Sequence, residues 1–223
     1  MPTATPPKTE KKLLKRFLSW TGSDEGGARA AHLVAPIRGE VLGVDRLAER
    51  ARAVARQEKI GPPPVHHGPG PLLRRLDDTR VVLREIQHAL SDAAAHGIDI
   101  SSAGEWLLDN YYIVQEHMRE VRMALPNRYY HELPKLASGT LAGYPRVYEL
   151  AIELIAHTEG RLDLDNITLF TREFQRVSLL RLGELWAIPT MLRLGLVENI
   201  RRMALRTAAR LAEVQEADTW AAR

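Results

Sequence analysis

The fold class is decided by the stretch SAGEWLLDNYYIVQEHMREVRMAL, residues 102–125. Its apolar side chains recur at spacings of four and three, which is the heptad seam of a helix that packs on other helices. The seam consists of Leu107, Tyr111, Val114, Met118, Val121 and Leu125. Ser102 and Glu105 form the S-x-x-E pattern of a capping box at its start. Pro126 ends the pattern, because proline cannot continue a helix.

Helical periodicity of this kind covers most of the chain. Further helices are predicted over residues 44–59, 72–96 and 146–159, from Asp165 onward, and from Gly183 to about Glu216, with a turn-rich connector over 126–145. Gly97 and Gly160 are placed to end two of these helices. The stretch 185–197 is apolar nearly all round and should be buried, and Pro189 should kink it unless it lies in the first turn. With no period-two strand pattern, we predict an all-α bundle of five or six antiparallel helices.

Composition divides the chain into a tail, a linker region, a main domain and a short end. Residues 1–30 are predicted to be a flexible basic tail, 31–71 a short helix and a Pro/Gly linker, 72–216 the helical bundle domain, and 217–223 a C-terminal tail. Within the first tail, residues 11–20 read KKLLKRFLSW. Basic residues beside Leu, Phe and Trp suit an anionic membrane surface or a partner's groove, and a frayed solvated terminus is the alternative interpretation.

Composition also excludes several classes of function. The 223 residues contain no cysteine, which excludes disulfides, thiolate metal sites and cysteine nucleophiles and fits a reducing cytosol. The net charge of +3 is too small to argue for nucleic acid. No signal peptide or spanning helix is predicted, because the most apolar stretch is shorter than the roughly 20 residues required and contains Arg193.

Seven strings in the chain carry a resemblance to a known family. They are WLLDNY (106–111), RYYHELPKL (128–136), LAGYPRVY (141–148), AHT (156–158), GELWA (183–187), VEN (197–199) and, more weakly, PIRGE (36–40). Together they resemble the amino-terminal region of the cyclic β-1,2-glucan synthases, over roughly residues 36–215.

This resemblance implies a very large enzyme of the bacterial inner membrane. Such enzymes build β-1,2-glucan from UDP-glucose and close it into a ring, using a glycosyltransferase domain between membrane helices and a phosphorylase-like hydrolase domain. The chain has no D-x-D motif with a downstream Q-x-x-R-W, so the resemblance carries over no catalytic residue. We therefore expect a non-catalytic accessory or scaffold domain without a cofactor, either a fragment or a short gene product, in the cytoplasm or at the cytoplasmic face of that membrane. Its expected partners are the membrane and glycosyltransferase domains of a synthase and β-1,2-glucan.

Aromatic and polar residues of the tyrosine-rich segment form a candidate glucan-contact set. Aromatic faces can stack on glucose rings, while carboxylate, amide and guanidinium groups can hold hydroxyls. The set is Trp106, Asp109, Asn110, Tyr129, Tyr130, Tyr144 and Arg146. The competing interpretation is structural, since buried aromatics usually pack and find one hydrogen-bond partner.

An enzyme that acts alone is the alternative from another class. Glycoside chemistry needs two carboxylates facing each other across a sugar, roughly 5 to 9.5 Å apart. The carboxylates near the aromatic residues are Asp109, Glu132, Glu149, Glu153 and Glu184. The sequence leaves such a pair open.

Two further patterns give weaker hypotheses. Glu85 and His88 have E-x-x-H spacing, but a di-iron bundle needs two such motifs, so no metal site is predicted. A basic stripe on the last helix could approach phosphates of nucleic acid or lipid. It consists of Arg201, Arg202, Arg206 and Arg210. A solvated face is the ordinary interpretation, and nucleic acid is not an expected partner.

Overall fold

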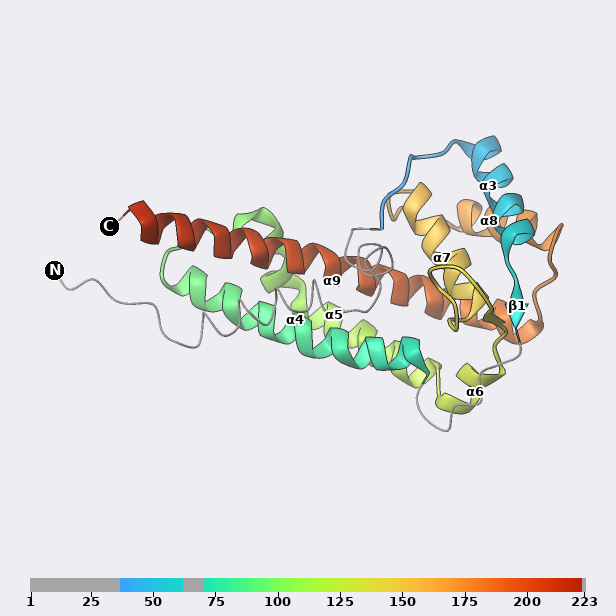
Figure 1. Ribbon diagram of the computed structural model, residues 1–223, viewed down its shortest axis with the longest axis horizontal. Coiled ribbons are helices and arrows are strands. Elements are labelled where there is room, and N and C mark those ends of the chain that lie inside the picture. The colour runs from blue at the N-terminus through green and yellow to red at the C-terminus, as the bar shows by residue number, and fades with distance from the viewer. Residues whose placement is uncertain (1–36, 62–69, 222–223) are drawn as a thin grey trace. The chain divides into compact units, whose positions relative to one another are not determined.

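The computed structural model describes residues 37–61 and 70–221 (Figure 1). These residues form seven helices and two very short strands. The helices are α3 (Val44–Gln57), α4 (Pro71–Ala95), α5 (Ser101–Ala124), α6 (Asn127–Glu132), α7 (Arg146–His157), α8 (Leu164–Gln175) and α9 (Leu182–Ala221). The all-α prediction is therefore confirmed. The predicted basic tail, with its patch at 11–20, lies outside the described residues.

The chain divides into two compact units. Among the described residues, unit 1 comprises 79–114 and 200–221, and unit 2 comprises 37–78 and 115–199. Helices α4, α5 and α9 contribute residues to both units. In the part of the chain that is described, no helix is both long enough and apolar enough to cross a membrane.

The apolar seams expected from the sequence are the buried faces of α4 and α5. On α4 the predicted members are all buried, namely Leu72, Leu76, Leu83, Ile86 and Leu90. Of the six predicted seam residues, four on α5 and Leu125 directly after it are buried, and Tyr111 is half-buried. Gly97 follows α4 with a φ of +72°, which confirms the predicted left-handed terminator.

The predicted capping box of α5 is wrong. The helix already includes Ser101, so Ser102 lies within the first turn and cannot be its cap. Asp99 supplies the polar contact at this end, because its Oδ1 accepts the backbone N–H of Ser101 at 2.8 Å. Ser101 has a φ of +62°, a conformation in which the chain turns sharply into the helix.

The connector after α5 holds more regular structure than the sequence indicates. α6 begins directly after Pro126, and β2 (Lys135–Leu136) pairs antiparallel with β1 (Ile60–Gly61). Neither strand is predicted by the sequence, since two residues are too few for an alternating pattern. The pairing joins the segment after α3 to the segment before α7, which are far apart in the sequence.

α7 and α8 follow the predicted pattern with one shift. Gly160 has a φ of +74°, as expected of the residue that ends α7. α8 begins at Leu164, one residue earlier than predicted, because Asp163 is its cap: the Asp163 carboxylate accepts the Asn166 N–H at 2.7 Å. Asp165 instead lies in the first turn, and α8 packs against α3.

α9 corrects two predictions about burial. The helix itself runs without interruption through Pro189. The two corrections concern Trp186 and the arginines. Trp186 belongs to the stretch expected to be buried, yet it is 71% exposed. Arg201 and Arg202 are buried, so the predicted basic stripe is not one solvated face. The reason is helical geometry, because Arg201 shares the buried face of Leu205, four residues along.

Gly195 sets the approach of α9 to α7 within unit 2. A Cβ atom at this position would lie 2.5 Å from Ile155 Cδ1 and 3.3 Å from Ile152 Cδ1. We expect Gly195→Ala to lower the free energy of unfolding by about 1–3 kcal/mol through overpacking, as measured by urea denaturation. Gly183→Ala on the same helix is the control, since its Cβ would meet Tyr129 Cε2 at an ordinary 3.6 Å. That variant should be unchanged or up to about 1 kcal/mol more stable, because alanine favours helix. Equal behaviour of the two variants would contradict this account of the α7–α9 contact.

Candidate functional site

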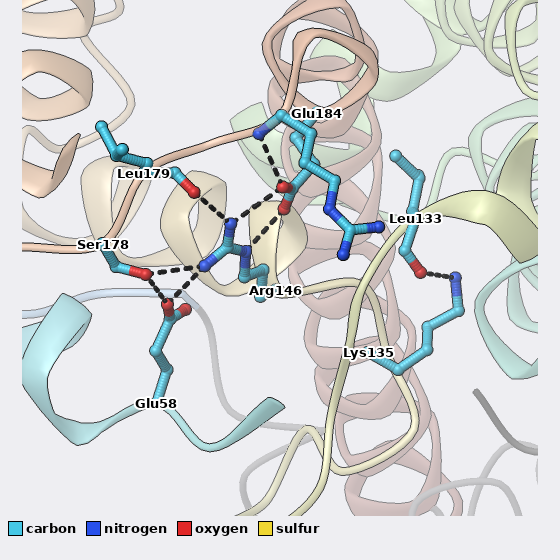
Figure 2. Close-up of polar contacts among 8 residues, drawn as sticks. Glu58, Leu133, Lys135, Arg146, Ser178, Leu179 and Glu184 are labelled. Atoms are coloured by element: carbon cyan, nitrogen blue, oxygen red, sulfur yellow. Dashed lines mark hydrogen bonds and ion pairs between the residues drawn. The ribbon is translucent and has the colours of Figure 1, made fainter. Parts of the chain in front are cut away.

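Arg146, the first residue of α7, is the centre of a buried polar cluster in unit 2 (Figure 2). Its Nε and Nη2 donate to the two carboxylate oxygens of Glu184 at 2.6 and 2.8 Å, a bidentate pair. Nη1 donates to Glu58 Oε1 at 2.7 Å and to Ser178 Oγ at 2.8 Å. Nη2 also donates to the carbonyl of Leu179 at 2.7 Å. All three guanidinium nitrogens are therefore engaged.

The cluster brings together four segments of the chain. Glu58 is the C-cap of α3, Ser178 and Leu179 lie between α8 and α9, and Glu184 lies in the first turn of α9. Glu184 also accepts the backbone N–H of Arg181 at 2.9 Å, which satisfies a donor at the helix start. Burial alone would lower the pKa of Arg146, but the two carboxylates outweigh it and raise that pKa.

Lys135 is a second buried cation in unit 2. Its Nζ donates to the carbonyls of Tyr130 and Leu133, the latter at 2.8 Å, and lies 4.1 Å from the centroid of the Tyr130 ring. Burial lowers the pKa of Lys135 to about 8, and Glu184 partly opposes that shift. The ammonium hydrogens point at backbone oxygens of its own turn, so this side chain holds the connector in place.

A third polar group lies where α7 meets α3. Glu153 Oε2 accepts from Arg50 Nε at 2.7 Å and lies 3.5 Å from His157 Nε2. Burial, and then the neighbouring charges of Glu153 and Glu58, raise the pKa of Glu149 to about 7. The charge of Glu149 therefore changes near neutral pH.

The strings that carry the resemblance also meet inside unit 2. The Gly39 N–H donates to the Ala156 carbonyl at 2.9 Å, and His157 Nδ1 lies 2.8 Å from the Glu40 carbonyl. Asn199 Oδ1 accepts the Ile37 N–H at 3.0 Å. PIRGE, AHT and VEN, which are far apart in the sequence, are thus joined by direct hydrogen bonds. Their shared role in this chain is to hold the unit together.

The candidate glucan-contact set falls into two groups. Trp106 and Asp109 are exposed and Asn110 is half-buried on the part of α5 that belongs to unit 1. Asn110 Nδ2 donates to the Trp106 carbonyl at 2.8 Å, which is a contact within the helix. The remaining members belong to unit 2 and come from α6, the connector and α7.

In that second group most side chains are enclosed. Tyr130, Tyr144 and Arg146 are buried, and Tyr144 meets Tyr148 edge to face with ring centroids 5.7 Å apart. Tyr129 is half-buried and donates its hydroxyl hydrogen to the Gly183 carbonyl. These four residues therefore make contacts within unit 2.

Sequence reasoning misses three members of the buried polar sites. Glu58, Ser178 and Lys135 stand in or beside loops, where no periodicity marks them. Glu184 is recognisable as a carboxylate near the aromatic residues, but nothing nearby indicates Arg146 as its partner, because 38 residues separate the two. A contact between distant segments leaves no local signal.

Two pairs of side chains have a spacing found among metal ligands, and both make other contacts in the structure. Asp163 and Asp165 have D-x-D spacing, but Asp163 caps α8. Glu153 and His157 contact Arg50 and the Glu40 carbonyl. Across residues 37–61 and 70–221, no group of three or more His, Asp and Glu side chains is arranged to hold a metal ion.

Comparison with known proteins gives one informative match. Over 134 residues the chain is 41% identical to the cyclic beta-(1,2)-glucan synthase NdvB of Rhizobium meliloti (strain 1021). The chain is similar to a cyclic glucan synthase. The match covers 60% of this chain and 5% of NdvB, so the chain spans about a twentieth of that relative's length. No family model matches the chain, and no solved structure matches it. The resemblance to this family is confirmed.

Arg146→Met tests the central role of the buried cluster. Removal of the guanidinium leaves Glu58 and Glu184 buried without their cation, so the free energy of unfolding should fall by about 3–5 kcal/mol. Arg50→Met is the control, because its ion pair with Glu153 is partly exposed and should contribute less than about 1 kcal/mol. The double variant Arg146→Met/Glu184→Met should recover part of the loss. Similar urea midpoints for Arg146→Met and Arg50→Met would contradict the assignment.

Glu149→Gln tests whether the pKa of Glu149 is raised in the folded state. The pKa of Glu149 is raised from 4.5 to about 7, so between these values the folded state binds more protons than the unfolded state. The contribution of Glu149 to wild-type stability should therefore fall as pH rises from about 4.5 to 7, and this contribution should be absent from Glu149→Gln. Above pH 7 the variant should be more stable by on the order of 1 kcal/mol, a figure reduced because solvent reaches the group.

The measurement is urea denaturation at pH 4.5, 6 and 8. Glu105→Gln, an exposed position on α5, is the matched control and should track the wild type at each pH. Identical pH profiles for wild type and Glu149→Gln would refute the raised pKa.

Proposed function

We propose that this chain is a non-catalytic helical domain of a protein of the cyclic β-1,2-glucan synthase type. The observation that carries the proposal is the 41% identity to NdvB over 134 residues. Because this match covers only 5% of NdvB, most of a synthase of that size lies outside the matched region. In this proposal the domain scaffolds the cytoplasmic side of such an enzyme, beside its membrane and glycosyltransferase domains.

The charged side chains form ion pairs with one another, which supports a scaffold role rather than a site for glycosyl transfer. Glycoside chemistry uses carboxylates that face a sugar. Glu184 and Arg146 instead face each other in a bidentate pair, and Glu153 faces Arg50. These groups stabilise the packing of α3, α7 and α9 within unit 2, which is what a scaffold requires.

A contact with glucan, as part of the same proposal, is assigned to the exposed face of α5 in unit 1. Trp106 is 51% exposed, and the exposed Asp109 lies three residues along, on a neighbouring position of the helix surface. An indole face can stack on a glucose ring while a carboxylate accepts hydrogen bonds from hydroxyls. Asn110 is the third member of this proposed contact. The other members of the candidate set stabilise unit 2 through contacts within it, namely Tyr129, Tyr130, Tyr144 and Arg146.

The proposal is tested by incubating the purified chain with UDP-glucose and Mg²⁺ or Mn²⁺. UDP release should not exceed the protein-free blank, and release above it that scales with protein concentration would overturn the scaffold role. Linear β-1,2-glucan oligosaccharides titrated against the same samples test the sugar contact. Trp106→Ala should weaken binding several-fold, by ~1 kcal/mol, and Trp186→Ala should leave it unchanged. Unchanged binding by Trp106→Ala would remove the α5 contact and leave the scaffold role standing.

A further inference from the structure

The junction between α8 and α9 exposes several large apolar side chains in unit 2. Val177, Leu179, Leu182 and Trp186 are 40%, 80%, 61% and 71% exposed. Leu182 and Trp186 are four residues apart on α9 and so lie on one face of the helix, and exposed Pro189 continues that face. These five residues form what we call the junction surface.

Hydrogen bonds hold the backbone that carries the junction surface. Arg146 Nη2 donates to the Leu179 carbonyl, and Ser178 Oγ donates to Glu58 Oε1 at 2.7 Å. Leu180 is buried beside them. Figure 2 shows the side chain of Leu179 extending away from the Arg146 guanidinium, while its carbonyl points toward it. The buried ion cluster therefore holds Leu179 in a position where folding of this unit does not bury it.

The charged residues between positions 176 and 193 are three arginines and one buried glutamate. Between residues 176 and 193 the acidic residue is Glu184, which is buried against Arg146. Arg181 is exposed between Leu179 and Leu182. Arg176 and Arg193 flank the surface, facing Glu173 at 2.8 Å and Glu120 at 3.6 Å, respectively. An apolar surface with the exposed Arg181 at its centre, and without an exposed carboxylate in its own stretch 176–193, complements a negatively charged, partly apolar partner.

We propose that the junction surface docks on an anionic lipid surface. Leu179, Leu182 and Trp186 would enter the boundary between headgroups and acyl chains, where leucine and tryptophan are favoured. Arg181 would contact the headgroup phosphates. This inference does not depend on the proposed synthase role, because it rests on exposure and charge alone.

The leucine and arginine side chains of the junction surface favour lipid over sugar as its binding partner. A sugar gains affinity from aromatic stacking and hydrogen bonds, and two exposed leucines supply neither. An acyl boundary gains from each buried leucine through the hydrophobic effect. Lipid phosphates, in turn, attract arginine near the membrane surface.

Brominated lipids give a direct test with the full-length chain. Trp20, Trp106 and Trp220 are replaced by Phe, so that Trp186 is the remaining fluorophore. Vesicles of phosphatidylcholine with phosphatidylglycerol should shift its emission to the blue, and brominated acyl chains should quench it. Vesicles of phosphatidylcholine alone should do so weakly. Absence of quenching with anionic vesicles would overturn the proposal.

A flotation assay with the same vesicles tests the leucines. Leu179→Asp/Leu182→Asp should weaken binding by about tenfold or more, since each leucine contributes about 1.5–3 kcal/mol when buried. Leu179→Ile/Leu182→Ile keeps the apolar surface and should bind like the wild type, as should Trp106→Ala. Circular dichroism checks that each variant is folded. Equal flotation of the aspartate variant and the wild type would assign vesicle binding to another segment, and no flotation of either would favour a protein partner; both results refute the proposal.

Discussion

Unit 2 depends on one constraint, which is that the buried guanidinium of Arg146 must keep its partners. Charges removed from water are tolerated where opposite charges and hydrogen bonds compensate them. Arg146 meets that condition through Glu184, Glu58, Ser178 and the Leu179 carbonyl, which are 38, 88, 32 and 33 residues away in the sequence. A displacement of any of these segments would leave a charge or a carbonyl without its partner, so the four segments are specified together.

This constraint connects the interior of unit 2 to its surface. The contacts that satisfy Arg146 determine where α9 begins and how the chain enters it. They also leave Leu179 and Trp186 outside the packed interior, where they are exposed to solvent or to a partner. Arg146, a candidate ligand for glucan on the sequence alone, thus acts within the unit, and its effect on the surface is indirect.

The similarity to a cyclic glucan synthase has a physical counterpart in these contacts. Gly39, Ala156, His157 and Asn199 belong to the strings that carry the resemblance, and hydrogen bonds link those strings across long sequence separations. Arg146 and Glu184 belong to two more of the strings. The match covers 60% of this chain and about a twentieth of NdvB.

The sequence by itself determined the helices and their apolar faces. Leu83 and Leu90 on α4, and the glycine that ends that helix, follow from spacing and backbone preference, because both are properties of a few neighbouring residues. The tertiary structure alone decided which faces are covered. The burial of Arg146 and Arg201, the exposure of Trp186 and the pairing of β1 with β2 depend on segments that are distant in the sequence. Periodicity states which residues share a face of a helix, but a charge is buried, or an indole left outside, according to what packs against that face.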